Sequence, residues 1–482
     1  MMTRSSDFGR FMRWLGLAAF VATASLRPAA AASPNEPLAV FIPLADAESV
    51  LAASQDVPAG LKGLSHESLT REWPTWVRSH DERVRSRVSR GEEDSLAFWL
   101  LYGVSFTDEP RATDDYRATL VRRFGNEHDA DARVNEVLIA RARDLTTALA
   151  TPGDDERRLT MLEVTRRAGY TMNTPEERNQ LGQYLLDNVV RCLRSYRSYT
   201  EQAQTAAQSN QAAEFSAPAS LFRDRGLSTD TSVLADYAVE QALLEIKEVG
   251  LLGPGSVRRA GVIGPGLDLI DKDGGYDLYP PQSTQPFVLM DTLQRLELAT
   301  GDKLDVAVFD ISSSVTGHLE RLVKRARDGR PYTLNLVRDT TRDWSPGAVR
   351  FWENVGSRIG TAGASTPSPD FDRVLTRAIE VSPRWAAKLR TNDLNIVFQQ
   401  MPLEEGDRYD LLVATNVLIY YRPFEQSLAL RNAARMLRPG GILISNTPLP
   451  DVADPDMRRV GETKVRVAGT NGHSVVWYQR GQ

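Results

Sequence analysis

Blocks of apolar residues, separated by amphipathic segments, run through the second half of the chain. From about residue 230 to 249, apolar side chains recur every three to four positions, which predicts a helix that Gly250 is placed to end. The next apolar run reads as a buried strand that breaks into the turn Gly264-Pro265-Gly266. Further strands are expected at 304–310, 331–337, 374–381, 394–399, 409–416 and 442–446, and helices at 284–298, 312–327, 346–359 and 424–437.

The order of these elements predicts the fold class. Strands that alternate with helices form a mostly parallel sheet that is covered by helices on both faces. Two final runs, 462–467 and 474–480, are joined by a turn at 470–473 and predict an antiparallel hairpin. We therefore expect residues 231–482 to form an α/β domain, a Rossmann-like mostly parallel sheet with a terminal antiparallel hairpin.

The first half of the chain has a helical pattern instead. Residues 33–212 contain long segments with few helix breakers, and in 129–150 the apolar residues recur at helical spacing. We expect an all-helical domain there, followed by a linker at 213–230. The aromatic residues of these helices are expected to pack between helices, with a ligand groove as the alternative.

The start of the chain has the layout of a secretory signal peptide. Arg4, Arg10 and Arg13 precede an apolar stretch at 14–26, and small residues that suit cleavage follow at 29–33. This layout predicts a signal peptide over 1–32 and export to the periplasm or the exterior. As a helix the apolar stretch spans only about 20 Å, short of a hydrocarbon core of about 30 Å, so no stable transmembrane span is expected.

Composition and charge exclude several classes of function. An apolar share of 41% and a charged share of 25% are typical of a globular protein with a buried core. A formal net charge of -5 argues against a general nucleic-acid partner, which needs a basic face. The single cysteine, Cys192, lies in an apolar helical pattern where burial is expected, and the five histidines are scattered, so no metal site is expected.

Polar features follow three of the predicted strands. The turn Gly264-Pro265-Gly266 ends one strand, Asp310 ends the next, and Asn416 ends a third. Because the carboxyl ends of parallel strands meet at one edge of a sheet, these features are expected to form a ligand site. The glycines let backbone N–H groups approach a ligand, and a neighbouring carboxylate suits the two hydroxyls of a ribose. The alternative role for Asp310 is a helix cap, since Ile311-Ser312 opens a helix.

Two later segments resemble class I S-adenosylmethionine-dependent methyltransferases. They are YDLLVATNVLIYY at 409–421 and AARMLRPGGIL at 433–443. In that family a strand of the first form is followed by a helix, an LRPGG bend and another strand. The resemblance covers about 231–480 and implies S-adenosyl-L-methionine as cofactor, with an unknown small molecule or protein as methyl acceptor. By resemblance, Gly264 and Gly266 form the cofactor turn, Asp310 holds the ribose hydroxyls, and Asn416 lies near the methionine moiety or the substrate.

The chain departs from the family pattern at several cofactor positions. Gln399 and Gln400 stand where an Asp commonly accepts from the adenine amino group, and an amide oxygen can accept the same bond. The acid that usually lies two residues before the first glycine is replaced by Val262. Asp268 takes the place of the third glycine, and its carboxylate is the candidate partner for the ammonium group of the cofactor.

A long polar loop follows the first strand, at 271–282. Within it, Tyr276, Asp277 and Tyr279 are candidates for the rim of a substrate or cofactor pocket, and the alternative is a loop held by its own turn contacts. Tyr420 is a further rim candidate that could instead pack in the core.

Two functions are compatible with this sequence. The first is an S-adenosylmethionine-dependent methyltransferase. The second is an exported, catalytically inactive methyltransferase-like binding module, because the cofactor is made in the cytoplasm and a signal peptide would remove the chain from it. Without export, a cytoplasmic protein is expected. A nicotinamide-dependent oxidoreductase is disfavoured because Leu269 occupies the third glycine position of its G-x-G-x-x-G turn.

Overall fold

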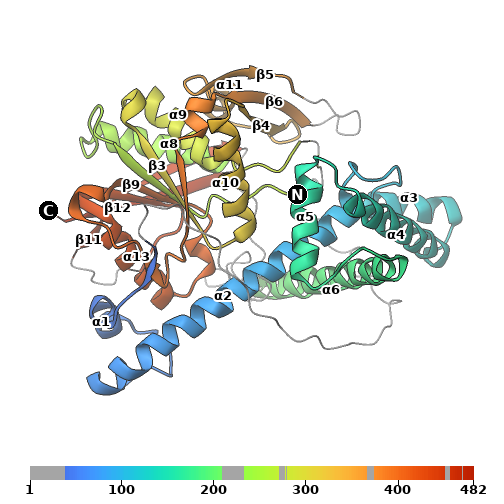
Figure 1. The fold of residues 1–482 in the computed structure, drawn as a ribbon, viewed down its shortest axis with the longest axis horizontal. Coiled ribbons are helices and arrows are strands. Elements are labelled where there is room, and N and C mark those ends of the chain that lie inside the picture. Colours follow the sequence, from blue (N-terminus) through green and yellow to red (C-terminus); the bar gives the residue numbers. More distant parts are fainter. Residues whose placement is uncertain are drawn as a thin grey trace. The chain divides into compact units, whose positions relative to one another are not determined.

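The computed structural model describes residues 38–208, 233–270, 277, 279–365, 374–450, 456–468 and 471–481. By contacts, the chain divides into two compact units (Figure 1). Among the described residues, the first unit holds 86–208 with the loop from 268 to 281, and the second holds 38–85, 233–267 and the chain from 282 onward. The expected signal peptide and linker lie outside the described residues, and the expected domain boundaries stay a prediction.

The first unit is built from helices, as the sequence predicts. They are the end of α2 (His66–Tyr102), then α3 (Asp114–Phe124), α4 (Glu127–Ala150), α5 (Glu156–Arg167) and α6 (Pro175–Gln208). Short polar side chains cap three of these helices, with Thr113, Asn126 and Asp155 each accepting a backbone N–H of the first turn. Trp99 and Leu145 are fully buried between the helices. For Trp99, this agrees with the expectation that aromatic residues of this region pack in the core.

The second unit is organised around a seven-stranded sheet in the order β11-β12-β10-β9-β2-β3-β7. The parallel part contains β2 (Arg259–Ile263), β3 (Asp305–Asp310), β7 (Leu389–Asp393), β9 (Tyr409–Ala414) and β10 (Leu437–Ser445). The hairpin of β11 (Met457–Ala468) and β12 (Asn471–Arg480) joins it through an antiparallel pairing of β12 with β10. The predicted mostly parallel sheet with a terminal antiparallel hairpin, preceded by helices, is therefore confirmed.

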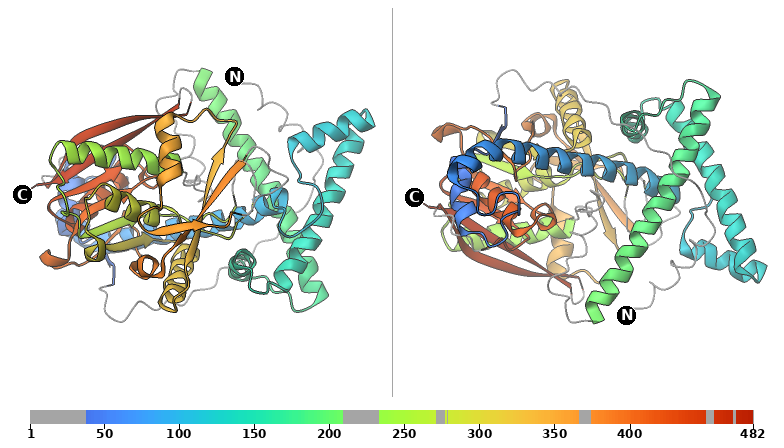
Figure 2. Two further views of the ribbon diagram at one scale, coloured as in Figure 1. Left: turned by 90° about the horizontal axis from the view of Figure 1, so that it is seen from above. Right: turned by 90° about the horizontal axis from the view of Figure 1, so that it is seen from below.

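Helices cover this sheet on both faces (Figure 1; Figure 2). Alternate residues of each strand point to opposite faces, and Val262, Val308 and Val413 share one buried cluster with α8 (Val233–Glu248), α9 (Gln285–Arg295) and α10 (Ser313–Arg327). On the other face, α13 (Pro423–Met436) packs against β10. Side chains that are buried on both faces explain why these strands read as continuous apolar runs.

Two strands predicted for the main sheet belong to another one. The runs at 331–337 and 374–381 do form strands, but β4 (Tyr332–Asp339) and β6 (Val374–Val381) pair with each other antiparallel. With β5 (Gly360–Gly363) they make a separate three-stranded sheet, inserted between α10 and β7. The insertion also holds α11 (Pro346–Asn354) and α12 (Pro383–Ala386). Periodicity reports that a strand is half-buried, and pairing partners are set by tertiary contacts.

The strand predicted at 394–399 is wrong. The parallel strand is β7, just before it, and residues 394–398 form a turn in which the N–H groups of Phe398 and Gln399 donate to the Asn395 carbonyl. Ile396, Val397 and Phe398 are buried in this turn, and Asn432 of α13 donates to two of its carbonyls. A short apolar run cannot by itself distinguish a strand from a buried turn, which explains the error.

The residues from 38 to 85 are part of the second unit. β1 (Val40–Phe41) pairs antiparallel with β8 (Gln399–Gln400), and α1 (Leu44–Ala53) packs on α13. In α2, the ring of Trp76 meets Phe398 and Phe424 edge to face. The first part of α2 is thereby held against the turn that follows β7.

Candidate functional site

Four parallel strands of the second unit end at the same edge of the sheet. The turn with Gly264 follows β2, Asp310 ends β3, Asp393 ends β7, and Asn416 follows β9. Asp310 and Asp393 are partners in the register of the parallel strands β3 and β7, so they lie side by side at the sheet edge. Of the residues predicted from the sequence, Gly264, Asp310 and Asn416 therefore lie at the ends of three adjacent strands.

The glycine turn has a backbone that side chains rarely adopt. Gly264 has φ +64° and Gly266 has φ +69°. A Cβ on Gly264 would lie 2.3 Å from Cγ2 of Val417, in the turn that follows β9. The Gly264 N–H also donates to the Phe309 carbonyl at 2.8 Å. Glycine at 264 is thus required by the close approach of two neighbouring turns, whether or not a ligand binds.

Asp310 is oriented by the first turn of α10. Its Oδ1 accepts the backbone N–H of Ser312 at 2.8 Å, and the residue is 8% exposed. The N-cap of α10 is Ser312, whose hydroxyl accepts the N–H of Val315. Asp310 is therefore not the N-cap residue of this helix, which was its alternative role.

Asn416 is held in a strained backbone conformation by a partner on the next strand. It has φ +57°, one of two positive values among the described non-glycine residues. Its N–H donates to Oδ1 of Asn446 at 2.9 Å, and Nδ2 of Asn446 donates back to its Oδ1 at 2.6 Å. Such strain often accompanies functional sites. Asn446 was not singled out from the sequence, although an Asn after β10 repeats the feature seen after β9.

Gln399 and Gln400 lie outside the main sheet, in β8, and contact the 38–85 segment. The Gln399 Oε1 atom accepts from Nη2 of Arg85 at 3.0 Å and from the N–H of Asn395 at 2.9 Å. Nε2 of Gln400 donates to Asp46 of α1 at 3.1 Å. The predicted contact of these glutamines with adenine stays a prediction.

The carboxylate that ends β7 is Asp393, which sequence reasoning missed. Its side chain is 62% exposed and accepts from Nη1 of Arg85 at 2.6 Å. The sequence pattern of β7 gave little indication of a strand, because in LRTND only Leu389 is fully buried.

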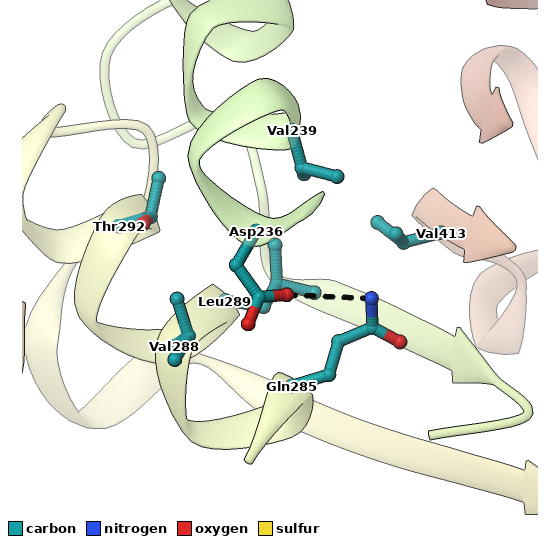
Figure 3. Close-up of a pocket in the computed structure, with 7 residues that line it drawn as sticks. All are labelled: Asp236, Val239, Gln285, Val288, Leu289, Thr292 and Val413. Atoms are coloured by element: carbon teal, nitrogen blue, oxygen red, sulfur yellow. Dashed lines mark hydrogen bonds between the residues drawn. The ribbon is translucent and has the colours of Figure 1, made fainter. Parts of the chain in front are cut away.

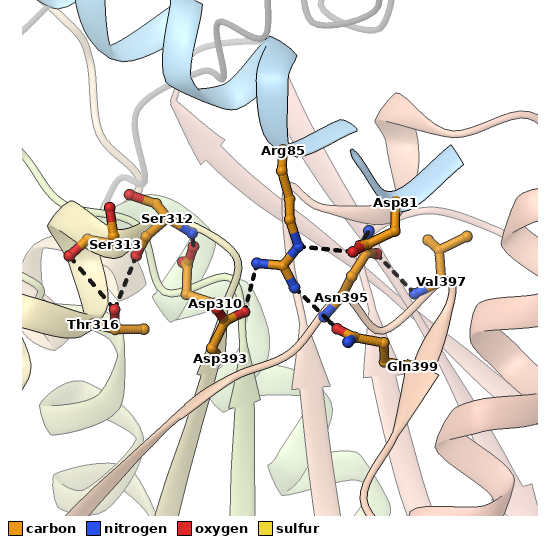
Figure 4. Close-up of polar contacts among 10 residues, drawn as sticks. All are labelled: Asp81, Arg85, Asp310, Ser312, Ser313, Thr316, Asp393, Asn395, Val397 and Gln399. Carbon is orange, nitrogen blue, oxygen red and sulfur yellow. Dashed lines mark hydrogen bonds and ion pairs between the residues drawn. The ribbon is translucent and has the colours of Figure 1, made fainter. Parts of the chain in front are cut away.

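Arg85 of α2 connects this helix to two of these side chains, Asp393 and Gln399 (Figure 4). Its Nε donates to Asp81 at 2.8 Å, and Asp81 in turn accepts from Nδ2 of Asn395 at 2.8 Å. Burial by itself would lower the pKa of Arg85, but Asp81 and Asp393 outweigh it and raise that pKa, so the guanidinium stays charged. Arg85, Asp81, Asn395 and Gln399 thus form a closed ring of hydrogen bonds.

A buried polar chain lies beneath the edge, between α8, α9 and β9 (Figure 3). Nε2 of Gln285 donates to Thr415, and lies 3.4 Å from Oδ1 of Asp236. Burial raises the pKa of Asp236 to about 7, and the bond from Gln285 only partly opposes it. Asp236 Oδ2 and Gln285 Oε1 have no hydrogen-bond partner among the described residues. Both atoms border a small cavity that is also lined by Val239, Val288 and Val413.

The remaining loop candidates lie in the first unit. Asp268 accepts from the Tyr279 hydroxyl at 2.6 Å. Asp277 is buried, and accepts from Nε1 of Trp99 at 2.7 Å and from the N–H groups of Val104 and Ser105. Burial would raise the pKa of Asp277, but these bonds, the Ser105 hydroxyl and nearby Arg157 outweigh it and lower that pKa.

Arg157, itself buried, donates to the carbonyls of Leu269, Asp277 and Tyr279. The loop is thus held from within the first unit. Tyr276 lies outside the described residues. Tyr420, in the second unit, is 3% exposed.

The described part of the chain holds neither a metal-binding cluster nor a membrane-spanning helix. No cluster of three or more His, Cys, Asp or Glu there has the arrangement of a metal site, and Cys192 is buried. Within those same ranges, every helix is too short or too polar to cross a bilayer.

Known proteins resemble this chain in structure but not in sequence. No protein-family model matches it, and no curated protein matches it. Among solved structures, the N-methyltransferase NodS from Bradyrhizobium japonicum aligns with 52% of this chain and 97% of its own, at 10% identity and a TM-score of 0.26. The magnesium protoporphyrin IX methyltransferase from Synechocystis, with S-adenosylmethionine bound, aligns with 52% of this chain and 79% of its own, at 10% identity and a TM-score of 0.25.

An S-adenosylmethionine-dependent methyltransferase from Aquifex aeolicus aligns over 52% of this chain and 94% of its own, at 10% identity and a TM-score of 0.24. The question of function therefore rests on the residues of this chain.

Proposed function

We propose that the second unit binds S-adenosylmethionine and that the protein is a methyltransferase for an acceptor that its sequence does not name. The observation that carries this proposal is the pair of carboxylates, Asp310 and Asp393, in register at the ends of two parallel strands beside a glycine turn. A nucleoside offers a ribose diol and, in adenine, an exocyclic amino group, and both are hydrogen-bond donors that suit carboxylates.

The residues present fit such a cofactor. Asp310 would hold the ribose hydroxyls, and Asp393 would accept from the adenine amino group in place of Gln399, whose Oε1 already has two donors. The turn at Gly264 and Gly266 would give the cofactor access to the backbone. When bound, S-adenosylmethionine supplies an activated methyl group, and the chain needs only to position the acceptor in line with it.

The test is equilibrium binding of S-adenosylhomocysteine to the full chain. We expect Asp310→Asn to weaken binding about tenfold or more, since a charged hydrogen-bond acceptor is lost. Asp302→Asn, an exposed residue just before the other end of β3, is the matched control and should leave affinity unchanged. Absence of binding at millimolar ligand, or equal affinity in Asp310→Asn, contradicts the proposal.

The second candidate is an exported binding module without catalysis. Two observations favour it: the signal-peptide pattern at 1–32, and the buried apolar Val262 at the position where the methyltransferase family that the sequence resembles usually has an acid. Cofactor binding without methyl transfer to any acceptor in an extract, together with secretion in a fractionation experiment, would support this alternative.

A further inference from the structure

Arg85 presents a positive donor beside the carboxylate at the end of β7. Its side chain is 23% exposed, and its three nitrogens contact Asp81, Asp393 and Gln399. Each terminal nitrogen of a guanidinium carries two N–H bonds. One bond on Nη1 is directed to Asp393 and one on Nη2 to Gln399, which leaves a second N–H on each nitrogen for a ligand.

The side chains of Asp81 and Asn395 set the orientation of Arg85. Asp81, whose side chain is 6% exposed, accepts from Nε, and Asn395 links Asp81 to the turn after β7. A planar guanidinium that is fixed on one side and along one edge has little rotational freedom left. The donor is therefore pre-oriented relative to Asp393, although it lies 308 positions earlier in the sequence.

The Arg85 donor and the Asp393 acceptor lie side by side and match the hydrogen-bonding groups on one edge of adenine. The adenine base has an amino donor at position 6 and an adjacent ring acceptor at N1. A 6-oxopurine has the reverse order on that edge, with an acceptor at position 6 and a donor at N1. A rigid Asp393–Arg85 pair therefore favours the 6-amino base, and opposes the 6-oxo base at both positions.

We propose that Arg85 is a specificity-determining residue that donates to the base N1 atom of a 6-aminopurine nucleoside, whose amino group is accepted by Asp393. This proposal rests on the proposed function, and adds to it a binding residue from the 38–85 segment. That segment then belongs to the ligand site of the second unit.

The experiment compares two ligands in calorimetric titrations of the full chain: S-adenosylhomocysteine and its 6-oxo counterpart, S-inosylhomocysteine. We expect the wild type to prefer the adenosyl ligand by about a hundredfold, with each mismatched hydrogen bond to a charged group contributing about tenfold. In Arg85→Ala, the affinity for S-adenosylhomocysteine should fall about tenfold, while the affinity for S-inosylhomocysteine changes little. The ratio of the two affinities should therefore fall to about ten. The preference is a ratio within one preparation, so a fraction of inactive protein does not alter it.

Two further variants separate recognition from folding. Arg85→Lys keeps the charge beside Asp81 but has a single terminal nitrogen, which cannot serve Asp393, Gln399 and the base together, so the preference should narrow here too. Arg71→Ala is the control on the same helix, because that side chain is 69% exposed and pairs only with its neighbour Glu72 in the described contacts. It should change neither affinity.

The outcomes distinguish this inference from the function beneath it. If wild type binds S-adenosylhomocysteine and Asp310→Asn weakens it, but both Arg85 variants keep the wild-type preference, the role of Arg85 is overturned and the cofactor site stands. If wild type binds neither ligand, both proposals fail.

Discussion

Asp236 is a carboxyl group enclosed by apolar side chains of α8, α9 and β9. Its neighbours Val239, Val288 and Val413 offer no hydrogen bonds from their side chains. Among the described residues, Gln285 is the one that donates a hydrogen bond to the Asp236 carboxyl group. The sequence gives no sign of this, because a polar residue in an amphipathic helix is expected on its exposed side. An acid in such a place favours its neutral form, and this makes the stability of the fold depend on pH.

We expect Asp236→Asn to stabilise the protein at pH 8 and to have little effect near pH 4. The folded pKa, about 7, is raised from the ordinary 3.8 chiefly by burial. The contribution of Asp236 is thus most favourable below pH 3.8 and is lost as pH rises through 7. At ~1.4 kcal/mol per pKa unit the full loss is ~4 kcal/mol, an upper limit. Urea unfolding at both pH values measures the difference in the free energy of unfolding between the wild type and Asp236→Asn. If this difference were the same at pH 4 and at pH 8, the buried-acid explanation would be refuted.

The turns at the carboxyl edge of the sheet pack against one another. The turn after β2 contacts the turn after β9 through Gly264 and Val417, and the turn after β9 contacts the turn after β10 through Asn416 and Asn446. Glycine, aspartate and asparagine after strands could be identified as candidate site residues from the sequence, because turn chemistry is local. The order of the strands in the sheet decides which turns touch each other. That order depends on contacts between residues that are distant in the sequence.

Replacing Gly264 with alanine tests this close fit. The methyl group would meet Val417 at 2.3 Å, and φ +64° is unfavourable for alanine. We expect Gly264→Ala to lower the free energy of unfolding by about 1–3 kcal/mol, through strain and displaced packing. Gly253→Ala is the control, because its Cβ would have open space and no positive φ. Equal urea midpoints for the two variants would mean that the turns adjust freely.

The second unit is assembled from segments that are distant in the chain. Ile42, Trp73 and Val77, all from the 38–85 segment, are almost completely buried within it. Nε1 of Trp73 donates to the Ile42 carbonyl at 2.9 Å, so the buried indole N–H finds its partner within the same segment. Residues that the sequence groups with a helical domain thus complete the core of the α/β unit.

A fragment of residues 231–482 should therefore not fold as the full chain does. Without the 38–85 segment, the buried faces of α13 and of the turn at 394–398 are exposed to water. We expect low soluble yield, and unfolding that is less cooperative in thermal denaturation followed by circular dichroism. The full chain serves as reference, and a fragment with an equally sharp transition at the same temperature would contradict this expectation.

Local sequence patterns were enough to predict the alternation of strands and helices, the terminal hairpin, the glycine turn and the carboxylate of Asp310 at a strand end. These features depend on periodicity and turn chemistry within a few residues of each other. The folded arrangement was needed to see that Asp393, and not Gln399 or Gln400, ends the neighbouring strand, because the edge strand β7 lacks an alternating apolar pattern. It also brought Arg85 to Asp393 across 308 positions of sequence, since no local pattern records which distant segments pack together.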